Sequence, residues 1–296
     1  MRKSLQIDVV SKHRCRLGEC PVWDVKQQMI CWIDILRGEI HQYSPVGKKH
    51  IKLSVPRFIG SVALCKDGNF IAALKNGISI IDRKTAKIKF ISNPEHNLPH
   101  NRFNDGKCDP EGRFWVGTMS LLDEDKNGSL YTLDEKLNID KKIPDVSVSN
   151  GLAWSVDHKT MYYIDTPTFE IVSYDYDSGT GTITNRKVVI SISEKDGYPD
   201  GMTIDDEGML WVAHWDGWQI TRWDPVNGKK LLSIPLPVAR VTSCTFGGEN
   251  LNDLYVTSAK TGLTASDLKK QPRAGALFVI RNTPFKGFPA IEFNFK

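Results

Sequence analysis

Short segments in which apolar and polar residues alternate, rich in β-branched and aromatic side chains, recur along the whole chain. Such alternation is typical of β-strands rather than helices. The segments form repeating groups of an apolar strand, a turn, a second strand, another turn and a third strand. We expect second strands at 29–35, 70–75, 114–119, 161–166, 210–215 and 253–258, and third strands at 39–45, 77–82, 128–134, 170–177, 219–225 and 276–281. No segment predicts a convincing helix, and residues 191–197 form at most one helical turn.

The first strand of each group opens at one recurring position, which we call the axial position. Its six members are Glu19, Gly60, Asp105, Asn150, Asp200 and Thr242. Neighbouring members are 41, 45, 45, 50 and 42 residues apart. A repeat of this length that contains several strands is typical of a β-propeller. We therefore predict an all-β fold, a single six-bladed β-propeller domain formed by residues 1–296 with four antiparallel strands in each blade.

The ends of the chain are expected to close the ring. A fourth, outer strand follows in most groups, for example at 49–54 and 186–192, and we expect residues 290–295 to form a strand as well. Residues 5–11 are expected to pair with strands from the end of the chain, because ring closure removes the free sheet edges that favour aggregation.

In an antiparallel blade, successive turns lie alternately at the two faces of the ring, so the axial position of every blade lies at the same mouth. The turns between second and third strands lie at the same mouth. Two of these turns are long, at 120–127 and 260–274. Long loops over a site are commonly functional, although a tolerated insertion is the alternative.

The composition, with 40% hydrophobic and 25% charged residues, is that of a soluble globular protein. The net charge of +4 comes without a basic run long enough to bind nucleic acid. We find no signal-peptide segment, and no window approaches the ~18 apolar residues of a membrane helix. The six cysteines lack CxxC spacing and are expected to be reduced and mostly buried, with a disulfide from Cys15 or Cys20 as the less favoured alternative. We therefore expect a cytoplasmic monomer or weak homodimer without nucleic-acid or membrane partners.

Oxygen-bearing side chains at the axial position predict a metal site. Equivalent positions of different blades converge on the axis, so Glu19, Asn150 and Asp200 would bring together two carboxylates and an amide carbonyl, with Asp105 as a fourth. Such ligands suit Ca2+, Mg2+ or Mn2+ and lack the thiolates and imidazoles of a structural zinc site. Turn hydrogen bonds are the alternative role for any one of these residues. Their common register favours the cation.

Two other groups of residues are expected at the same mouth. Arg102 and Asn104 lie next to an axial aspartate and could hold a polyhydroxylated ligand and steady negative charge. His214, Trp215 and Trp218 either line a sugar-binding wall or pack between blades. The chain contains no GxSxG, HExxH or P-loop motif, so it offers no support for a serine hydrolase, zincin or nucleotide-binding protein.

At these residues the chain resembles the SMP-30/gluconolactonase/luciferin-regenerating-enzyme family, which includes regucalcin and bacterial sugar lactonases. The matching segments are 17–24, 101–119, 149–155, 198–213 and 242–248, and the resemblance runs in order from about residue 14 to residue 282. The family's fold is a six-bladed propeller, which agrees with the repeat count.

The resemblance implies a role for each site residue. Glu19, Asn150 and Asp200 correspond to the family's divalent-metal ligands, and Asp200 also to its general base. Arg102 and Asn104 correspond to its substrate-contacting pair, beside which we expect Asp105 to contribute to substrate binding.

The implied reaction is hydrolysis of a gluconolactone-like aldonolactone by way of one divalent ion, with Ca2+ preferred over Zn2+, Mn2+, Mg2+ or Fe2+. A carboxylate bound to a cation is a weak base, so a water activated by the metal and oriented by Asp200 is the other candidate nucleophile.

The chain departs from the family at several positions. Cys20 stands where glycine is common. Leu121 and Leu122 stand where regucalcin-like members carry an acidic residue that contacts substrate, and Asp123 or Glu124 is the candidate substitute.

Two other functions are open on the sequence. One is hydrolysis of another ester or a phosphotriester, because one fold hosts many chemistries. The other is a calcium-binding regulatory propeller without catalysis. Arg102 and Asn104 argue against the latter, since a cation buffer does not require them at the mouth.

Overall fold

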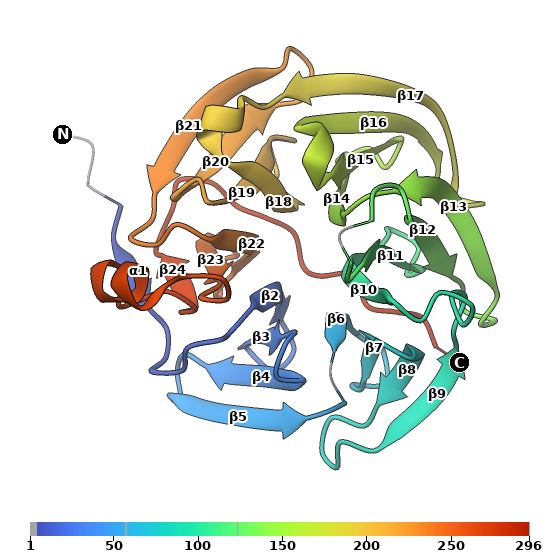
Figure 1. Ribbon diagram of the computed structural model, residues 1–296, viewed down its shortest axis with the longest axis horizontal. Coiled ribbons are helices and arrows are strands. Elements are labelled where there is room, and N and C mark those ends of the chain that lie inside the picture. The colour runs from blue at the N-terminus through green and yellow to red at the C-terminus, as the bar shows by residue number, and fades with distance from the viewer. Residues whose placement is uncertain (1–4, 57, 123, 296) are drawn as a thin grey trace.

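The computed structural model of the protein describes residues 5–56, 58–122 and 124–295. Within these ranges the strands form six four-stranded antiparallel sheets arranged around a central axis (Figure 1). The prediction of an all-β six-bladed propeller with four antiparallel strands in each blade is confirmed.

The first five blades each use four consecutive strands, which run in chain order from the axis outward. Blade one has β2 (Gly18–Asp24), β3 (Met29–Asp34), β4 (Glu39–Ser44) and β5 (Lys49–Ser54). Blade two has β6 (Ile59–Leu64), β7 (Phe70–Leu74), β8 (Gly77–Ile81) and β9 (Ile88–Ser92). Blade three has β10 (Asn101–Cys108), β11 (Phe114–Ser120), β12 (Gly128–Leu133) and β13 (Ile139–Val146). Blade four has β14 (Ser149–Trp154), β15 (Thr160–Asp165), β16 (Glu170–Asp177) and β17 (Thr182–Ser191), and blade five has β18 (Tyr198–Ile204), β19 (Leu210–Trp215), β20 (Gln219–Asp224) and β21 (Lys229–Pro235).

Blade six combines both ends of the chain. Its strands are β22 (Val241–Gly247), β23 (Asp253–Ser258), β24 (Phe278–Ile280) and the N-terminal β1 (Ile7–Val9). β1 pairs antiparallel with β24, with Ile7 opposite Ile280 and Val9 opposite Phe278. The predicted closure of the ring by N- and C-terminal strands is confirmed.

Two buried tryptophans that pack between neighbouring blades have their polar atoms paired. Trp115 in β11 and Trp211 in β19 are fully buried. Their indole N–H groups donate to buried aspartates in the turn before each strand, to Asp109 Oδ2 at 2.8 Å and Asp205 Oδ2 at 2.9 Å. Because an unpaired buried N–H is costly, these aspartates make the large apolar rings compatible with a fully buried position.

In every blade the inner strand carries one residue more than its neighbour at the axial position. The irregularities lie between Glu19 and Val22, Ile59 and Ser61, Phe103 and Gly106, Asn150 and Leu152, Pro199 and Met202, and Val241 and Ser243. A β-bulge bends the strand and changes the direction of the side chain at the extra residue. The axial position is therefore a conformational repeat as well as a sequence repeat.

The expectation of no convincing helix is wrong at the 260–274 loop, which contains α1 (Ala265–Lys270). A capping box starts this helix: Thr264 Oγ1 accepts from the N–H of Asp267 at 3.1 Å, and Asp267 Oδ2 accepts from the N–H of Thr264 at 3.0 Å. Two 3-10 turns, η1 (Thr166–Thr168) and η2 (Glu194–Asp196), complete the helical residues described, and η2 lies in the expected turn. In the described part of the chain, no helix has the length and apolar character needed to span a membrane.

The predicted strand at 290–295 is also wrong. Within this segment Phe293 forms an isolated parallel bridge with Cys65 of blade two. Residues 285–295, which we call the tail, cross the ring instead (Figure 1). The tail bonds to turns that join first and second strands: Lys286 O accepts from the N–H of Asp206, and the N–H of Asn294 donates to Gly112 O.

These turns lie at the mouth opposite the axial position. The physical reason for the different course of the tail is that β1 already occupies the outer edge of β24. No free edge is left there for the tail to join. Its anchor is the fully buried Phe293, which packs between blades two and three.

All six cysteines are free and buried, as expected from their number and spacing. The alternative of a disulfide from Cys15 or Cys20 is not realised.

Candidate functional site

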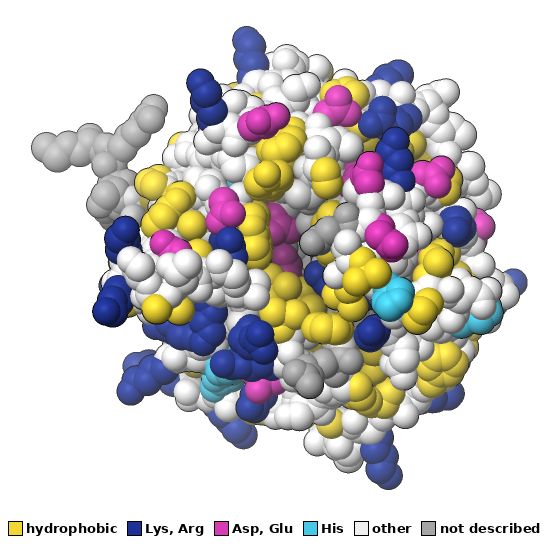
Figure 2. Space-filling view, in the orientation of Figure 1, with side chains coloured by type: hydrophobic (Ala, Val, Ile, Leu, Met, Phe, Trp, Pro, Cys, Tyr) yellow, Lys and Arg dark blue, Asp and Glu magenta, His cyan; other side chains and the backbone are white. Residues whose placement is uncertain are grey.

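Three carboxylates converge at the axial position of alternate blades. Glu19 comes from β2, Asp105 from β10 and Asp200 from β18, and all three are buried. Figure 2 shows acidic side chains at the bottom of the hollow in the centre of the ring. The structure therefore brings together the residues that the repeat assigned to one site.

Each carboxylate is held by the backbone of its own bulge. In all three cases it accepts a hydrogen bond from the N–H of the following residue. The donors are the N–H groups of Cys20 to Glu19 Oε2 at 2.7 Å, Gly106 to Asp105 Oδ1 at 2.8 Å, and Gly201 to Asp200. Cys20 adopts a left-handed φ of 47°, a conformation that glycine adopts more readily than a residue with a side chain.

Burial and mutual repulsion raise the pKa of these acids. For Glu19, burial raises the pKa well above its ordinary value, and the charges of Asp200 and Asp105 raise it further. For Asp200, burial and then the charge of Asp105 have the same effect. Burial also raises the pKa of Asp105, against a smaller opposing effect of Lys107. Such acids gain most when a cation replaces their protons.

Asn150 offers the clearest free ligand atom for a cation. Its Oδ1 is buried and has no hydrogen-bond partner, while its Nδ2 donates to Thr166 Oγ1 at 2.9 Å. Thr166 Oγ1 in turn donates to the carbonyl of Pro199 at 2.8 Å, directly before Asp200. This chain of bonds fixes the amide so that its oxygen is the free end. Sequence reasoning missed Thr166, although it follows β15 at the mouth where the site was expected.

The donor set fits an oxygen-preferring divalent ion. Glu19, Asp200 and the Asn150 oxygen are the residues that could hold it, which is the ligand set the sequence predicted. The three carboxylates alone are less well placed. Two groups of three possible metal ligands within 4.8 Å of one another are found among the described residues, and neither contains these carboxylates. Asp105 is thus a neighbour of the predicted ligands, and the amide is needed to complete them.

Arg102 supplies the positive charge beside these acids. Its guanidinium is buried, and Nη1 donates to Asn104 Oδ1 at 2.7 Å and to the Phe103 carbonyl at 2.9 Å. Burial lowers the pKa of Arg102 to about 10, against the opposing charges of Glu19 and Asp200, so the side chain stays charged at neutral pH. Asn104 Nδ2 donates to the Ser149 carbonyl at 2.8 Å, so this amide is held by blade four while it orients the guanidinium.

The two remaining axial residues build the wall. A Cβ at Gly60 would lie 2.3 Å from the carbonyl oxygen of Phe103, so only glycine lets the Arg102–Asn104 segment pack so closely on blade two. Thr242 Oγ1 donates to the Gly18 carbonyl at 2.6 Å, next to Glu19. The lack of a carboxylate at these two positions thus has a structural cause.

A cavity of about 390 Å3 opens beside Arg102 on the mouth side. Its wall includes Glu95, a buried acid that the sequence reasoning missed because it lies outside the repeat. Glu95 accepts from Asn101 Nδ2 at 2.9 Å, Thr118 Oγ1 at 2.8 Å and the Tyr131 hydroxyl at 3.0 Å. This saturation of its oxygens makes Glu95 a rigid part of the wall.

The wall proposed for His214 does not form. His214 is fully buried, and its Nε2 lies 2.6 Å from Thr221 Oγ1 on the neighbouring strand of the same blade, so this contact lies within a blade and not between blades. Trp215 and Trp218 are partly exposed, and the Arg240 guanidinium covers the ring of Trp215.

The 120–127 loop gives a mixed result. Asp123 lies outside the described residues. Glu124 is bonded within its own loop, to Ser120 Oγ at 3.0 Å and Asn127 Nδ2 at 2.7 Å. Leu121 and Leu122 are exposed.

Comparisons with known proteins agree with this architecture. The profile described as SMP-30/Gluconolactonase/LRE-like region matches residues 17–260. Regucalcin of Xenopus laevis is 39% identical over 295 residues, which span 98% of this chain and 99% of that protein. Among solved structures, a luciferin-regenerating enzyme has a TM-score of 0.93 at 33% identity and covers 98% of this chain and 100% of its own. A calcium-binding protein, regucalcin, from Agrobacterium tumefaciens has a TM-score of 0.93 at 28% identity and covers 98% and 97%.

Proposed function

The chain belongs to the SMP-30/gluconolactonase/LRE-like family, and from this premise we propose that it is a metal-dependent sugar lactonase that opens an aldonolactone to the aldonic acid. One observation carries the proposal. A buried arginine that lines an open cavity stands beside two buried acids and a site with an unpartnered amide oxygen. A site that only bound a cation would have no use for the arginine, because its charge competes with the ion.

A divalent cation held by Glu19, Asn150 and Asp200 would polarise the lactone carbonyl and stabilise the charge that develops on its oxygen. The donors are oxygens alone, which favours Ca2+ over softer ions such as Zn2+. The description of the Agrobacterium tumefaciens relative as a calcium-binding protein is consistent with this preference.

The chain's own residues would orient the reactants. Arg102 and Asn104 hold ring hydroxyls at the mouth-side cavity, so that the carbonyl faces the acids. Asp200 accepts a proton from the attacking water as the new carbon–oxygen bond forms. The bond from the carbonyl carbon to the ring oxygen then breaks, and the ring oxygen takes up the proton that Asp200 accepted and becomes the hydroxyl of the aldonic acid.

Asp105 contributes from a different direction than the sequence suggested. It lines a cavity at the far end of the channel rather than the one beside Arg102. Its role from this position is electrostatic: after burial, its charge is the second cause that raises the pKa of Asp200 in the cation-free protein.

The test is hydrolysis of a panel of aldonolactones, followed with a pH indicator and corrected for spontaneous opening. The protein is stripped with EDTA and reloaded with single metals. Turnover of one or two lactones that requires metal supports the proposal. Cation binding without turnover of any lactone would instead favour the calcium-binding regulatory propeller, and turnover of other esters or phosphotriesters alone would replace the substrate class.

A further inference from the structure

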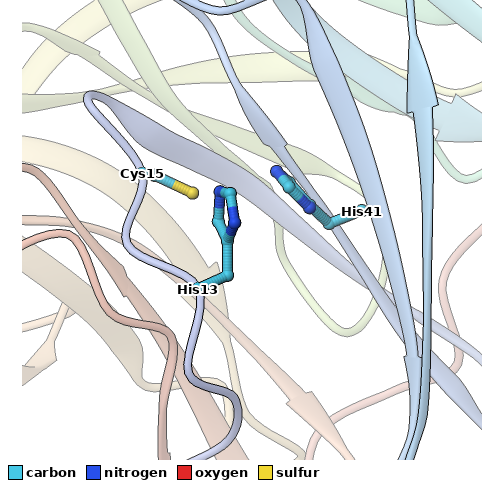
Figure 3. A group of neighbouring side chains, drawn as sticks. All are labelled: His13, Cys15 and His41. Carbon is cyan, nitrogen blue, oxygen red and sulfur yellow. The ribbon is translucent and has the colours of Figure 1, made fainter.

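A second cluster of metal-binding side chains lies outside the channel, where the N-terminal segment meets blade one. His13 and Cys15 belong to the link between β1 and β2, and His41 belongs to β4. Figure 3 shows the ring of His13 between the thiol of Cys15 and the ring of His41. One ligand atom from each lies within 4.8 Å of the other two. The cluster thus places imidazole and thiol groups from the link and from β4 side by side.

His41 is prepared to bind a metal. It is fully buried, and its Nε2 has no hydrogen-bond partner. The other nitrogen, Nδ1, lies 3.1 Å from Nε2 of His50, and the ring stacks on Trp32 with 4.9 Å between centroids. The tautomer that donates from Nδ1 leaves the Nε2 lone pair free, which is the arrangement that orients metal-bound histidines. Burial lowers the pKa of His41 to about 2, so the imidazole is neutral.

Glu39 adds an oxygen next to both rings. Its Oε2 is buried without a hydrogen-bond partner and lies 3.3 Å from Nε2 of His41 and 3.5 Å from Nε2 of His13. A tetrahedral ion with bonds of about 2.0–2.3 Å separates its ligand atoms by about 3.3–3.8 Å. The separations of Oε2 from the two histidine nitrogens therefore match the distances between ligand atoms around such an ion.

Cys15 completes the set with sulfur. Its side chain is buried, its N–H donates to the Gly275 carbonyl at 2.7 Å, and the Trp32 indole hydrogen-bonds to its thiol. Burial raises the pKa of this thiol, so a metal must displace its proton. Its sulfur lies within 4.8 Å of a ring nitrogen of each histidine, which is at most about 1 Å beyond the tetrahedral spacing to those two nitrogens.

Two cationic side chains border the cluster, and a bound ion would compete with them for His13 and Glu39. Arg37 lies against Asp34, with Nε 3.7 Å from Oδ2, and its Nη1 is 3.5 Å from Nε2 of His13. Lys52 occupies the other oxygen of Glu39, Oε1, at 2.9 Å. The Cys15 thiolate and the Glu39 carboxylate would neutralise a divalent ion.

We propose that Cys15, His13 and His41, with Glu39 as the fourth donor, form a binding site for a zinc-class ion that ties the N-terminal segment to blade one. Sulfur and nitrogen donors select Zn2+ or Co2+, whereas the all-oxygen channel site suits Ca2+. The ion is structural in its effect: it crosslinks the link after β1, the strand that closes the ring, to β4. Its place is separate from the channel, so it does not depend on the lactonase proposal.

The experiment uses Co2+ as a probe, because cobalt bound by a thiolate absorbs in the near ultraviolet by charge transfer and an all-oxygen site does not. Reduced, metal-stripped protein is titrated with Co2+ and then with Zn2+. We expect one equivalent of Co2+ to produce the band and Zn2+ to abolish it. A titration without the band overturns the proposal.

Variants locate the thiolate. Cys15→Ala should remove the band, whereas Cys20→Ala, which deletes the cysteine beside the channel, should keep it. The reverse pattern, or loss of the band in both, overturns the assignment. His13→Gln alters a partly exposed residue and should weaken Co2+ binding by about 10–100-fold. Unchanged affinity in this variant also overturns the site, even if Cys15→Ala does not fold.

A thermal measurement tests the structural effect. If Zn2+ binds only the folded state, a concentration of 100 times its dissociation constant stabilises that state by about 2.7 kcal/mol. The rise in Tm should appear in the wild type and in Cys20→Ala and be absent from Cys15→Ala. An equal rise in all three proteins would show that Zn2+ acts elsewhere.

Discussion

The two ends of the central channel are built from the same inner strands and differ in chemistry. The mouth end holds Glu19, Asp200 and Arg102. The far end is a cavity of about 500 Å3 with a mostly apolar lining, including Val22, Val62 and Ala153, and the tail crosses it. The bulge in each inner strand separates the two, because residues before and after the extra residue face different parts of the channel.

This difference indicates that the far end of the channel stabilises the fold, whereas the mouth end carries the candidate chemistry. At the far end, Lys107 Nζ donates to the carbonyls of Leu152 at 3.0 Å and Met202 at 2.7 Å, which joins blades three, four and five. At the mouth end, repulsion among the acids works against the fold until a cation is present. We therefore expect changes at the mouth to reduce activity and changes at the far end to reduce stability.

The largest effect is expected for Asp200→Asn, which removes a cation ligand and the proton acceptor together. We predict a loss of about 10³-fold or more in kcat/KM, equivalent to about 4 kcal/mol, with loss of bound metal. Lactone hydrolysis and elemental analysis measure both. Asp206→Asn, an exposed aspartate in the same blade, is the matched control and should behave as the wild type. Retention of full activity in Asp200→Asn would contradict the proposed mechanism.

Phe293→Ala should have the next largest effect, at the opposite end. The side chain is fully buried between blades two and three, so its removal is expected to cost about 3–5 kcal/mol of unfolding free energy. Denaturant unfolding measures the loss, while activity per folded molecule should be unchanged. Phe288→Ala, in the same tail but 45% exposed, should cost much less. Equal losses in the two variants would mean that the tail is not anchored through Phe293.

Arg102→Ala should lower kcat/KM by about 10²-fold, equivalent to about 2.7 kcal/mol, because the hydroxyl contacts of the substrate are lost. Metal content should be retained, since Arg102 competes with the cation and does not bind it. Arg102→Lys keeps the charge without the planar fork and should recover only part of the activity. A variant that loses metal as well would place Arg102 among the residues that build the cation site.

Thr166→Val tests a positioning residue. The valine cannot accept from Asn150 Nδ2, so the amide loses its orientation and we expect cation affinity to fall by about 10-fold. Isothermal titration with Ca2+ measures this, and saturating metal should restore turnover. Thr168→Val, which alters an exposed threonine in the same 3-10 turn, is the control. Equal affinities in the two variants would remove Thr166 from the site.

The smallest effect concerns pH. In cation-free protein, burial and neighbouring charge raise the pKa of Glu19 and Asp200, so the folded state binds more protons than the unfolded chain above the ordinary carboxyl pKa. Their contribution to stability therefore falls as pH rises above about 4. Asp105→Asn removes one of the repelling charges. In EDTA, the Tm of the wild type should fall relative to this variant as pH rises, and saturating Ca2+ should reduce the difference. A difference that grows in the opposite sense would contradict the shifts.

The sequence predicted most of the fold because the axial position repeats. Six segments in one register predicted the number of blades. The need to pair free sheet edges when the ring closes predicted that β1 would pair with a strand from the end of the chain, which is β24. The bulges were invisible, because an extra residue can be recognised only against its partner strand. Helix α1 has no apolar periodicity, and its capping box was the sole local signal. The sequence around Phe293 is typical of a strand, but the path of this segment depends on which sheet edges are already paired with other strands.

The convergence of the axial residues could also be predicted from the repeat, whereas their roles stay predictions. Glu19, Asp105, Asn150 and Asp200 share the register, so their convergence followed from the fold. Thr166 and His41 lie in predicted strands of the repeat, but their contacts with Asn150 and with His13 and Cys15 join segments that have no common position in the blades. Periodicity has no means of finding such contacts.

Closure by β1 also has a consequence for biosynthesis. Ile7 leaves the ribosome early, yet its partner Ile280 is made only after five complete blades. Until β24 is made, β1 has no strand to pair with, and its unpaired edge is open to pairing with other chains. A nascent chain that stalls within blade six would keep that edge exposed, so the last few dozen codons decide whether the product is a ring or an aggregation-prone fragment.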